Sequence, residues 1–585
     1  MCGIFAYVGS QTDAPQQVIT GLKKLEYRGY DSWGVAYQTG NKLQVTKQIG
    51  KIGDATLRAL DSTLAIGHTR WATHGGISVA NAHPHLNPNQ TLAVVHNGIV
   101  ENYSELKQTL DEYPFKSETD TEVITALLDK NLKSNSLKKA LILTTQTLKG
   151  LNGVVVAHAP TRQIAAIRNG SPLVIGKTDS GYYLASDTTA LAGIAKQIVF
   201  LAEGELALLS QEYISLTNFE GQPIVINWQP LQLSAEAVNK GRFPHFMIKE
   251  ISEQPAVLGK VLSDQAELLV FQQKIAGNKL ILVGCGTAYH ACLAASYYFA
   301  QLGGTWVQAF SASEFKLWRN MIDDSMHVLF VSQSGETIDI IEHAQWLHQH
   351  EQTFSALVNR IDSSLSRLAS QTLSLGAGPE ICVLATKSFT AQLATFLLLA
   401  TPQPKAMQIK RQLQQLIEAL PRVIGRTYCE QHLEPLVPVL QTNKNLFVIG
   451  KQDCYPLALE AALKIKESTY LHMEGFAAGE LKHGVLALIE TGTPVFVLVP
   501  DSVAAGEILT SAQEAKARGA FLVGVGPINK LDRQLFDLVL PTPALGLATG
   551  IIQSVIFQLI AYYTTVVLGN DPDKPRNLAK SVTVK

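Results

Sequence analysis

The sequence predicts an α+β domain followed by two α/β domains, each built on a doubly wound parallel sheet. Three observations support this fold class. The chain of 585 residues is too long for one hydrophobic core, the pattern changes to a βαβ rhythm near residue 244, and the second half contains an internal repeat. We therefore expect three domains, a linker and a short C-terminal tail.

Residues 1–228 are expected to form the α+β domain, because short apolar runs alternate there with few long helical patterns. Residues 229–243 are polar and irregular, and we predict a linker over this stretch. The runs with the clearest strand pattern are 92–95, 153–158, 181–185 and 205–209.

From residue 244 onward, strand-like runs at 280–283, 327–331, 446–449 and 495–499 alternate with helical stretches, which is typical of a parallel sheet. The segment that starts at Lys279 recurs after a shift of 166 positions, so that Gly284 corresponds to Gly450 and Phe310 to Phe476. The repeat predicts two domains of one fold. We place these domains at 244–425 and 426–570 and a tail at 571–585.

The composition excludes several kinds of partner. Lys and Arg number 48 against 49 Asp and Glu, so nothing in the charge favours nucleic acid or an anionic membrane. The six cysteines are scattered and form no zinc pattern, so we expect no metal and a reducing compartment. The N-terminus lacks the pattern of a signal peptide, and we expect a cytoplasmic protein.

Residues 541–570 carry no charge and need separate treatment, because 551–569 is largely apolar. A membrane span is one interpretation. Gln553, Ser554 and Gln558 interrupt the stretch at helical spacing, and for that reason we predict a buried core helix.

Cys2 becomes the first residue once the initiator methionine is removed. Its thiol then lies beside its own α-amine, whose pKa of about 8 suits a local base. Taken alone, Cys2 is also compatible with an incidental cysteine that has no catalytic role.

Four polar motifs follow Cys2: LEYRGYDS (25–32), HTRWATHGG (68–76), HNGIVEN (96–102) and SETDTE (117–122). Three of these motifs also have a purely structural interpretation. These interpretations are core histidines for His68 and His74, a type I′ turn for Asn97-Gly98, and a helix N-cap for 117–122.

Together and in this order, the motifs and Cys2 resemble the class II glutamine amidotransferase domain over residues 2–228. The resemblance implies the αββα sandwich of N-terminal-nucleophile hydrolases, in which Cys2 attacks the γ-carbonyl of glutamine, forms a thioester and releases ammonia. It also implies roles for six further residues. These are Asn97 and Gly98 in the oxyanion hole, Arg70 at the α-carboxylate of glutamine, Asp120 at its α-ammonium, and Thr73 and His74 along the pocket.

The second half offers three turns that suit a sugar phosphate. SQSGET (332–337) lies between a strand and a helix, where hydroxyl groups and backbone N–H groups can hold a phosphate; the alternative is a simple helix cap with Glu336. GCGTAY (284–289) and ATKSFT (385–390) are expected at the same end of the sheet, where ligands of such folds bind. No turn matches a nucleotide-binding motif, and we expect no cofactor.

These segments resemble the sugar isomerase (SIS) fold, present twice, and the whole chain resembles the glucosamine-6-phosphate synthase family through LEAALKIKES, GELKHG and DKPRNLAKSVTVK. The resemblance implies that fructose 6-phosphate and glutamine yield glucosamine 6-phosphate and glutamate, the first step of amino-sugar synthesis, in a homodimer. The residues it implies are His483 for opening the sugar ring, Lys580 for a Schiff base at C2, Glu467 and Lys464 for proton transfer, Thr287, Ser332, Gln333, Ser334, Thr337 and Val383 for binding the sugar phosphate, and Trp71 and Ala579 for ammonia passage.

Two positions depart from this family. Ala288 stands where serine is usual, and Leu384-Ala385 where Ala-Ser is common; each lost hydroxyl weakens phosphate binding by about 1 kcal/mol. A SIS-type deglycase or a transaminase of another sugar phosphate is therefore an alternative. A regulator that only binds sugar phosphate is a further one, but it has no need of Cys2, Glu467, His483 and Lys580 together.

Overall fold

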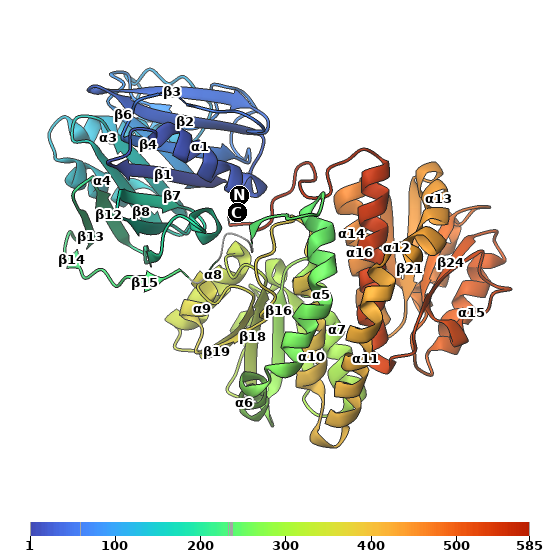
Figure 1. The fold of residues 1–585 in the computed structure, drawn as a ribbon. Helices are drawn as coiled ribbons and strands as arrows, with labels where there is room; N and C mark the ends of the chain where they lie inside the picture. Colours follow the sequence, from blue (N-terminus) through green and yellow to red (C-terminus); the bar gives the residue numbers. More distant parts are fainter. Residues whose placement is uncertain (1, 59, 232, 234–237, 584–585) are drawn as a thin grey trace. The chain divides into compact units, whose positions relative to one another are not determined.

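The computed structural model describes residues 2–58, 60–231, 233 and 238–583. The chain forms two compact units, one of Met1–Asn239 with Ala579–Lys585 and one of Lys240–Leu578. Each unit is described by itself, with the element labels of Figure 1.

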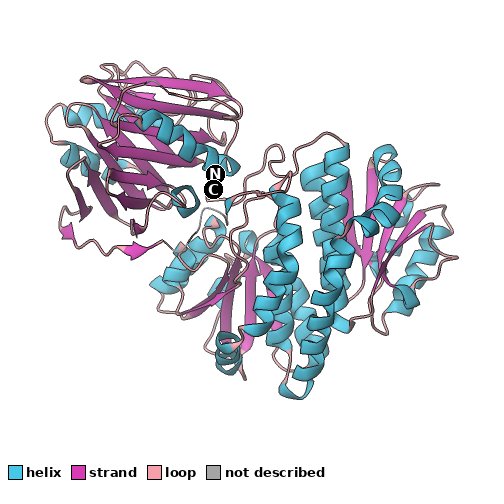
Figure 2. Cartoon of the chain, viewed as in Figure 1, coloured by secondary structure: helices cyan, strands magenta, loops and turns pink. Residues whose placement is uncertain are grey.

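Over its described residues, the first unit contains two antiparallel sheets and four α-helices; Figure 2 shows them as strands and helices. The larger sheet has the strand order β15-β11-β9-β10-β1-β4-β2-β3, and the smaller one β14-β13-β12-β8-β7-β6-β5. The larger sheet comprises β1 (Gly3–Gly9), β2 (Ser32–Thr39), β3 (Lys42–Ile49), β4 (Leu64–Arg70), β9 (Val174–Thr178), β10 (Gly181–Ala185), β11 (Gln197–Phe200) and β15 (Gln229–Pro230). The smaller comprises β5 (His85–Leu86), β6 (Leu92–Gly98), β7 (Asn152–His158), β8 (Gln163–Asn169), β12 (Glu205–Leu209), β13 (Ile214–Asn218) and β14 (Pro223–Ile224), and the helices are α1 (Ala14–Leu25), α2 (Tyr103–Gln108), α3 (Thr121–Leu132) and α4 (Leu137–Thr147).

The two sheets stack on each other, and helices cover their outer faces. Because side chains alternate along a strand, Ile4 and Ala6 of β1 join the core between the sheets, whereas Phe5 joins the core under α1. In the same way, Ala93 of β6 faces the other sheet and Val94 faces α3 and α4. The unit is therefore an αββα sandwich, as the sequence predicted. The four predicted strand runs are confirmed as parts of β6, β7, β10 and β12.

The second unit contains two parallel five-stranded sheets with the orders β17-β16-β18-β19-β20 and β22-β21-β23-β24-β25. The first sheet region comprises α5 (Phe246–Ser263), α6 (Ala266–Ile275), β16 (Lys279–Gly284), α7 (Thr287–Leu302), β17 (Val307–Ser311), β18 (Met326–Ser332), α8 (Ile338–Gln349), β19 (Phe354–Val358), α9 (Ser364–Leu368), β20 (Gln371–Ser374), α10 (Lys387–Ala400) and α11 (Ala406–Ile424). The second comprises α12 (Arg426–Tyr428), α13 (Val437–Thr442), β21 (Asn445–Gly450), α14 (Cys454–Thr469), β22 (His472–Ala477), β23 (Pro494–Leu498), α15 (Ala505–Lys516), β24 (Phe521–Pro527), β25 (Leu538–Thr542) and α16 (Thr549–Val567).

The predicted repeat is confirmed by strand register as well as by strand order. Val283 of β16 pairs with Phe310 of β17, and Ile449 of β21 pairs with Phe476 of β22, which is the same pair shifted by 166. In both sheets the second strand along the chain lies on one side of the first strand, and the third strand lies on the other side. Each sheet therefore has a switch point of the kind at which doubly wound folds bind ligands.

The apolar C-terminal stretch forms α16, which packs against α14, α5 and α11. Gly546–Val567 is long and apolar enough to span a membrane: an 18-residue stretch of it has a mean hydropathy of 1.5, and 83% of that stretch is buried within the protein. The polar residues of the helix have partners inside the core. Gln553 Nε2 donates to the carbonyl oxygens of Val499 (2.8 Å) and Val525 (2.9 Å), and Gln558 Oε1 accepts from Gln254 (2.8 Å). The prediction of a buried core helix is therefore confirmed.

Replacing Gln553 by leucine is expected to lower the stability of the second unit by about 1–3 kcal/mol, because the Val499 carbonyl loses a buried donor. Thermal unfolding followed by circular dichroism measures the effect. Gln513→Leu on the exposed face of α15 is the matched control and should leave the melting temperature nearly unchanged. Equal shifts in the two variants would contradict this role of Gln553.

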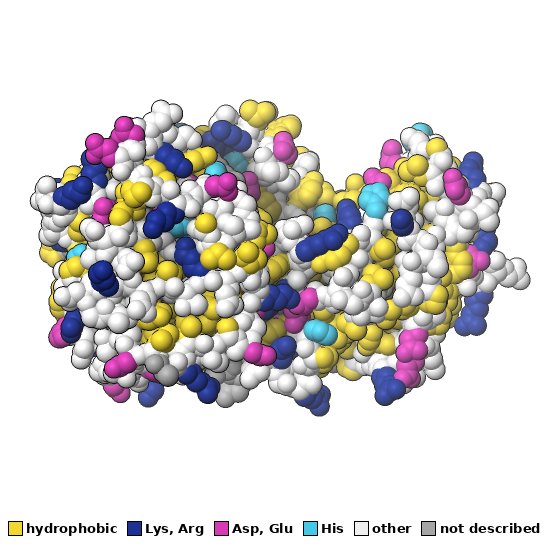
Figure 3. Space-filling model, turned by 90° about the horizontal axis from the view of Figure 1, so that it is seen from above, with side chains coloured by type: hydrophobic (Ala, Val, Ile, Leu, Met, Phe, Trp, Pro, Cys, Tyr) yellow, Lys and Arg dark blue, Asp and Glu magenta, His cyan; other side chains and the backbone are white. Residues whose placement is uncertain are grey.

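On the face shown in Figure 3, basic and acidic side chains are interspersed, in keeping with the net charge of -1.

Candidate functional site

Cys2 lies at one end of two central strands of the larger sheet of the first unit, where β1 begins and β4 ends. Because β1 and β4 are antiparallel and Gly3 pairs with Thr69, Cys2 is brought beside the segment that follows Arg70. The Trp71 backbone N–H donates to Cys2 Sγ at 3.3 Å. Burial raises the pKa of the Cys2 thiol, while the Trp71 N–H and the charge of Arg70 act in the opposite direction.

Asn97 and Gly98 end β6 and reach the same place from the smaller sheet. Asn97 Nδ2 donates to the Cys2 carbonyl oxygen at 2.9 Å. Both residues pair with β7, so the alternative of a type I′ turn is wrong. Gly98 has φ +143°, and a Cβ there would overlap the Leu151 carbonyl oxygen, so this position requires glycine.

Arg70, predicted to bind the α-carboxylate of glutamine, is almost fully buried at the end of β4. Its guanidinium donates to the carbonyl oxygens of His74, Gly75 and Gly76. The loop that follows β4 is therefore folded around Arg70. Any carboxylate that Arg70 binds has to share it with these carbonyl groups or displace them.

The other residues predicted to bind glutamine lie in this loop and at the N-terminus of α3. Asp120 is buried at the N-terminus of α3, and its Oδ2 accepts from the Val100 N–H at 2.7 Å. Asp120 thus supports the segment after Gly98. Thr73 is exposed, and the His74 ring lies edge-on to Tyr103 with centroids 5.4 Å apart.

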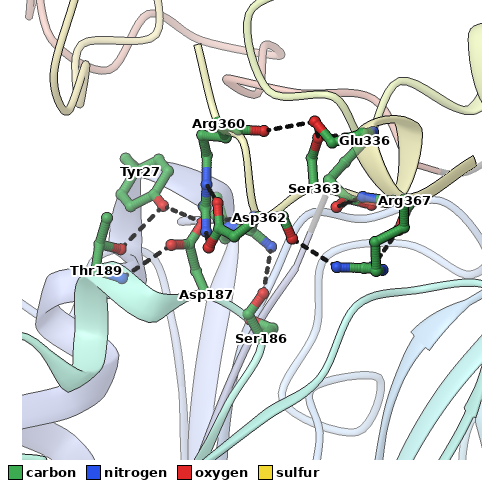
Figure 4. Close-up of polar contacts among 12 residues, drawn as sticks. Tyr27, Ser186, Asp187, Thr189, Glu336, Arg360, Asp362, Ser363 and Arg367 are labelled. Atoms are coloured by element: carbon green, nitrogen blue, oxygen red, sulfur yellow. Dashed lines mark hydrogen bonds and ion pairs between the residues drawn. The ribbon is translucent and has the colours of Figure 1, made fainter. Parts of the chain in front are cut away.

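The LEYRGYDS motif has a structural role in the first unit. Arg28 and Asp187 form a buried ion pair at 2.8 Å, and Asp187 also accepts from the Tyr27 hydroxyl, one of the contacts drawn in Figure 4. Ser186, next to Asp187, holds Ile4: its Oγ accepts from the Ile4 N–H at 3.0 Å. The motif therefore anchors the strand that begins directly after Cys2.

Four histidines are buried behind Cys2 and Asn97: His68, His83, His85 and His96. The rings of His68 and His83 lie 4.3 Å apart, and those of His83 and His85 4.9 Å apart. Burial lowers the pKa of all four, and for His68 burial and the charge of Arg70 lower it to about 3. All four are therefore neutral near neutral pH.

These buried neutral histidines are expected to destabilise the first unit in mild acid. His68 binds its proton only near pH 3 when folded but near pH 6.5 when unfolded. Its contribution to stability is therefore fully present above about pH 6.5 and is lost as the pH falls towards 3, by about 1.4 kcal/mol per pH unit.

Hydrogen exchange of β4 and β6 peptides at pH 7 and pH 5, corrected for intrinsic rates, measures this loss. The His68→Gln variant should show a shallower dependence on pH, by one proton. Equal free energies of opening at the two pH values would contradict the assignment of neutral histidines.

In the second unit, SQSGET forms the turn between β18 and α8 at the switch point of the first sheet. Ser332 Oγ accepts from the Gly335 N–H at 3.0 Å and lies 3.1 Å from Thr337 Oγ1, and Ser334 Oγ accepts from the Glu336 N–H at 3.1 Å. Gln333 is half-buried in the same turn. Glu336 Oε1 accepts from the Ser364 N–H at 2.8 Å, so Glu336 connects this turn to the start of α9.

Thr287 starts α7 after the neighbouring strand β16, and the structure joins it to α14 of the second repeat. Lys464 Nζ donates to Thr287 Oγ1 at 3.2 Å and lies 2.6 Å from Glu467 Oε2. Glu460 Oε1 accepts from Thr287 at 3.0 Å, and Glu460 Oε2 lies 2.8 Å from His290 Nδ1. Three predicted residues, Thr287, Lys464 and Glu467, are thus brought together.

The charges of this cluster determine the protonation state of Lys464. Burial alone would lower its pKa, but the carboxylates of Glu460 and Glu467 outweigh burial and raise the pKa above its usual range. Lys464 is therefore a cation at every physiological pH, and the Glu467 side chain beside it is about one-fifth exposed.

Val383 lies on the loop before α10, and the C-terminal segment is bound to this loop. The Val383 N–H donates to the Asp573 carbonyl oxygen at 3.1 Å. The Asp573 carboxylate accepts from the N–H groups of Phe246 and Met247, both at 2.8 Å, and so caps the N-terminus of α5. Asp573 therefore fixes the chain seven residues before Lys580.

The remaining predicted residues differ in their burial. His483 is exposed at the end of the 3₁₀ segment Ala478–His483, and Ala579 and Lys580 are half-buried and belong to the first unit. Ala288 lies in the first turn of α7 and Ala385 just before α10, while Leu384 is fully buried.

Sequence reasoning did not find Glu460, His290 or Asp573, and it treated His68 only as a core histidine. Glu460 precedes Lys464 by one helical turn within LEAALKIKES, which was an available signal. The other three residues act through contacts between distant segments, for which the sequence pattern offers no signal.

Residues 68–193 match the glutamine amidotransferase domain family, and residues 275–402 and 439–568 each match the SIS domain family. Along its full length, the chain is 37% identical to the glutamine–fructose-6-phosphate aminotransferase (isomerizing) of Thermococcus kodakarensis and 38% identical to that of Aquifex aeolicus, with all of each chain covered.

Among solved structures, the C-terminal domain of glucosamine–fructose-6-phosphate aminotransferase from Francisella tularensis is similar to this chain. It has a TM-score of 0.52 and 28% identity, and the match covers 58% of this chain and 100% of that one.

Proposed function

Because the chain belongs to the family of isomerising glutamine–fructose-6-phosphate aminotransferases, we propose that it converts D-fructose 6-phosphate and L-glutamine to D-glucosamine 6-phosphate and L-glutamate. The observation that carries the proposal is the cluster of Thr287, Lys464 and Glu467 at a sheet switch point, in a chain that also places an amide donor against Cys2. One half has the groups to release ammonia and the other the groups to move a proton on a sugar.

In the glutaminase half, Cys2 acts after removal of Met1, with its own α-amine as the base. Sγ attacks the γ-carbonyl of glutamine, ammonia leaves, and water then hydrolyses the thioester to glutamate. Asn97 Nδ2 and the Gly98 N–H donate hydrogen bonds to the carbonyl oxygen and so stabilise the negative charge that develops on it. Glutamine is bound by Arg70 at the α-carboxylate and Asp120 at the α-ammonium, with Thr73 and His74 lining the pocket.

In the isomerase half, His483 opens the sugar ring and Lys580 forms a Schiff base at C2. Ammonia displaces the lysine from C2, and Glu467 then moves a proton from C1 to C2 to give the amino aldose. The Lys464 cation stabilises the negative charge that appears during this transfer. The phosphate is bound by the hydroxyl-rich turns and the neighbouring loop, through Thr287, Ser332, Gln333, Ser334, Thr337 and Val383.

Several further features belong to the same proposal. The glutaminase domain covers 1–228, the SIS domains 244–425 and 426–570, and the catalytic tail 571–585. Trp71 and Ala579 contribute to ammonia passage, and the protein works as a homodimer in the cytoplasm without a membrane partner.

A second candidate is a deglycase or transaminase that acts on another sugar phosphate, and Ala288 and Ala385 favour it because each removes a hydroxyl from a phosphate-binding turn. Incubation with fructose 6-phosphate and glutamine labelled with ¹⁵N at the amide, followed by mass spectrometry, separates the two. Labelled glucosamine 6-phosphate in equal amount to glutamate supports the main proposal. Label in a different sugar, or none in any sugar, would refute it.

A further inference from the structure

His68 lies directly behind the amide that contacts Cys2. It is a fully buried residue of β4, and its Nε2 lies 3.2 Å from Asn97 Oδ1 and 3.1 Å from the His96 carbonyl oxygen. On its other side, Asn97 Nδ2 donates to the Cys2 carbonyl oxygen at 2.9 Å. A chain of contacts therefore runs from His68 through Asn97 to Cys2.

The contacts determine which nitrogen of His68 carries the proton. Both atoms that face Nε2 are oxygen acceptors, so Nε2 must be the donor. Nδ1 is buried and has no hydrogen-bond partner among the described residues. Burial and the charge of Arg70 lower the pKa of His68 to about 3, which keeps the ring neutral in this single tautomer.

The donor on Nε2 also determines the orientation of the Asn97 amide. If the amide were rotated by 180°, its NH₂ group would face the His68 N–H and its oxygen would face the Cys2 carbonyl oxygen. Both hydrogen bonds would be replaced by contacts between like groups in a buried site, which is strongly unfavourable.

We propose that His68 is a positioning residue for glutamine hydrolysis: its Nε2–H holds Asn97 Oδ1 so that Asn97 Nδ2 is presented to the carbonyl oxygen of glutamine as it becomes an oxyanion. His68 acts only through Asn97 and needs no contact with the substrate. The inference rests on the proposed glutaminase function, because the amide has a charge to stabilise only during that reaction.

Three variants of the full-length enzyme test the proposal. His68→Leu removes the donor at similar volume. His68→Gln places an N–H group as many bonds from Cβ as the histidine Nε2. His68→Asn places its N–H group one bond closer to Cβ, too short to reach Asn97. The measurements are kcat and KM for glutamine, inhibition by glutamate γ-semialdehyde, and the rate of Cys2 alkylation by iodoacetamide. The aldehyde adduct of Cys2 places an oxygen where the oxyanion forms, whereas alkylation reports only the thiol.

We expect kcat of His68→Leu to fall by about 100-fold, the loss typical of one oxyanion donor, with KM changed less than threefold. The aldehyde should bind more weakly by a similar factor, and alkylation should stay near the wild-type rate. His68→Gln should recover kcat to within about tenfold of wild type, and His68→Asn should not. If His68→Leu does not fold, His68→Asn carries the same expectation.

Unchanged kcat in His68→Leu, or undiminished aldehyde affinity beside a lowered kcat, would overturn the proposal. So would equal activity of the Gln and Leu variants, since this would show that the N–H is not what matters. If the wild-type enzyme itself failed to hydrolyse glutamine, the proposed function would be wrong, which is a distinct result.

Discussion

Replacing Cys2 by alanine is expected to reduce glutamine hydrolysis by about 10⁴-fold or more, because the attacking atom is lost and the remaining donors supply only part of the rate. The groups proposed for isomerisation do not include Cys2, so the variant should still isomerise hexose phosphate. Glutamate release and amino-sugar formation from glutamine, together with hexose-phosphate isomerisation, are the measurements.

Cys429→Ala is the matched control, since it removes a thiol that lies outside both proposed sites. It should retain both activities. Persistence of glutamine-dependent synthesis in Cys2→Ala would show that another group is the nucleophile. Mass spectrometry of the wild-type protein adds a check: a retained Met1 beside normal glutamine turnover would exclude the α-amine of Cys2 as the base.

Replacing Glu467 by glutamine is expected to slow isomerisation by about 10²–10⁴-fold, the usual contribution of a general base. Glutamine has the size of glutamate but cannot accept the C1 proton, and Lys464, a cation held by Glu460, cannot replace it. Glutamine hydrolysis depends on the first unit and should continue.

Incorporation of deuterium from D₂O at C2 of the product measures the proton transfer directly. Glu418→Gln, on the exposed side of α11, is the control and should leave the rate of incorporation unchanged. Normal incorporation in Glu467→Gln would show that another group moves the proton.

Much of the fold could be predicted from the sequence because it depends on local patterns. Strands such as β6 and β18 appeared as apolar runs, and the shift of 166 recurs in the pairing of Val283 with Phe310 and of Ile449 with Phe476. Polar residues of α16 looked like interruptions of an apolar helix. In the structure they bind strand and helix groups of the core, for example Gln553 at Val499.

Less of the candidate sites could be predicted from the sequence, because they depend on contacts between distant segments. The family resemblance singled out Cys2 and Asn97, but only the fold shows them in contact across 95 positions of sequence. The Glu460–His290 pair connects the two repeats across 170 positions. No periodic pattern specifies which helix faces of two domains meet, and the double role of His68 as core residue and amide partner follows only from its neighbours.

The cap of α5 has a consequence for protein synthesis. The helix starts at Phe246, yet the carboxylate that receives its first free N–H groups belongs to Asp573, made 327 residues later. While the ribosome is still translating the unit, this helix end has no protein partner of that kind, and the loop of Val383 lacks its contact with the tail. A nascent chain therefore cannot fix the segment that leads to Lys580 until translation has almost finished.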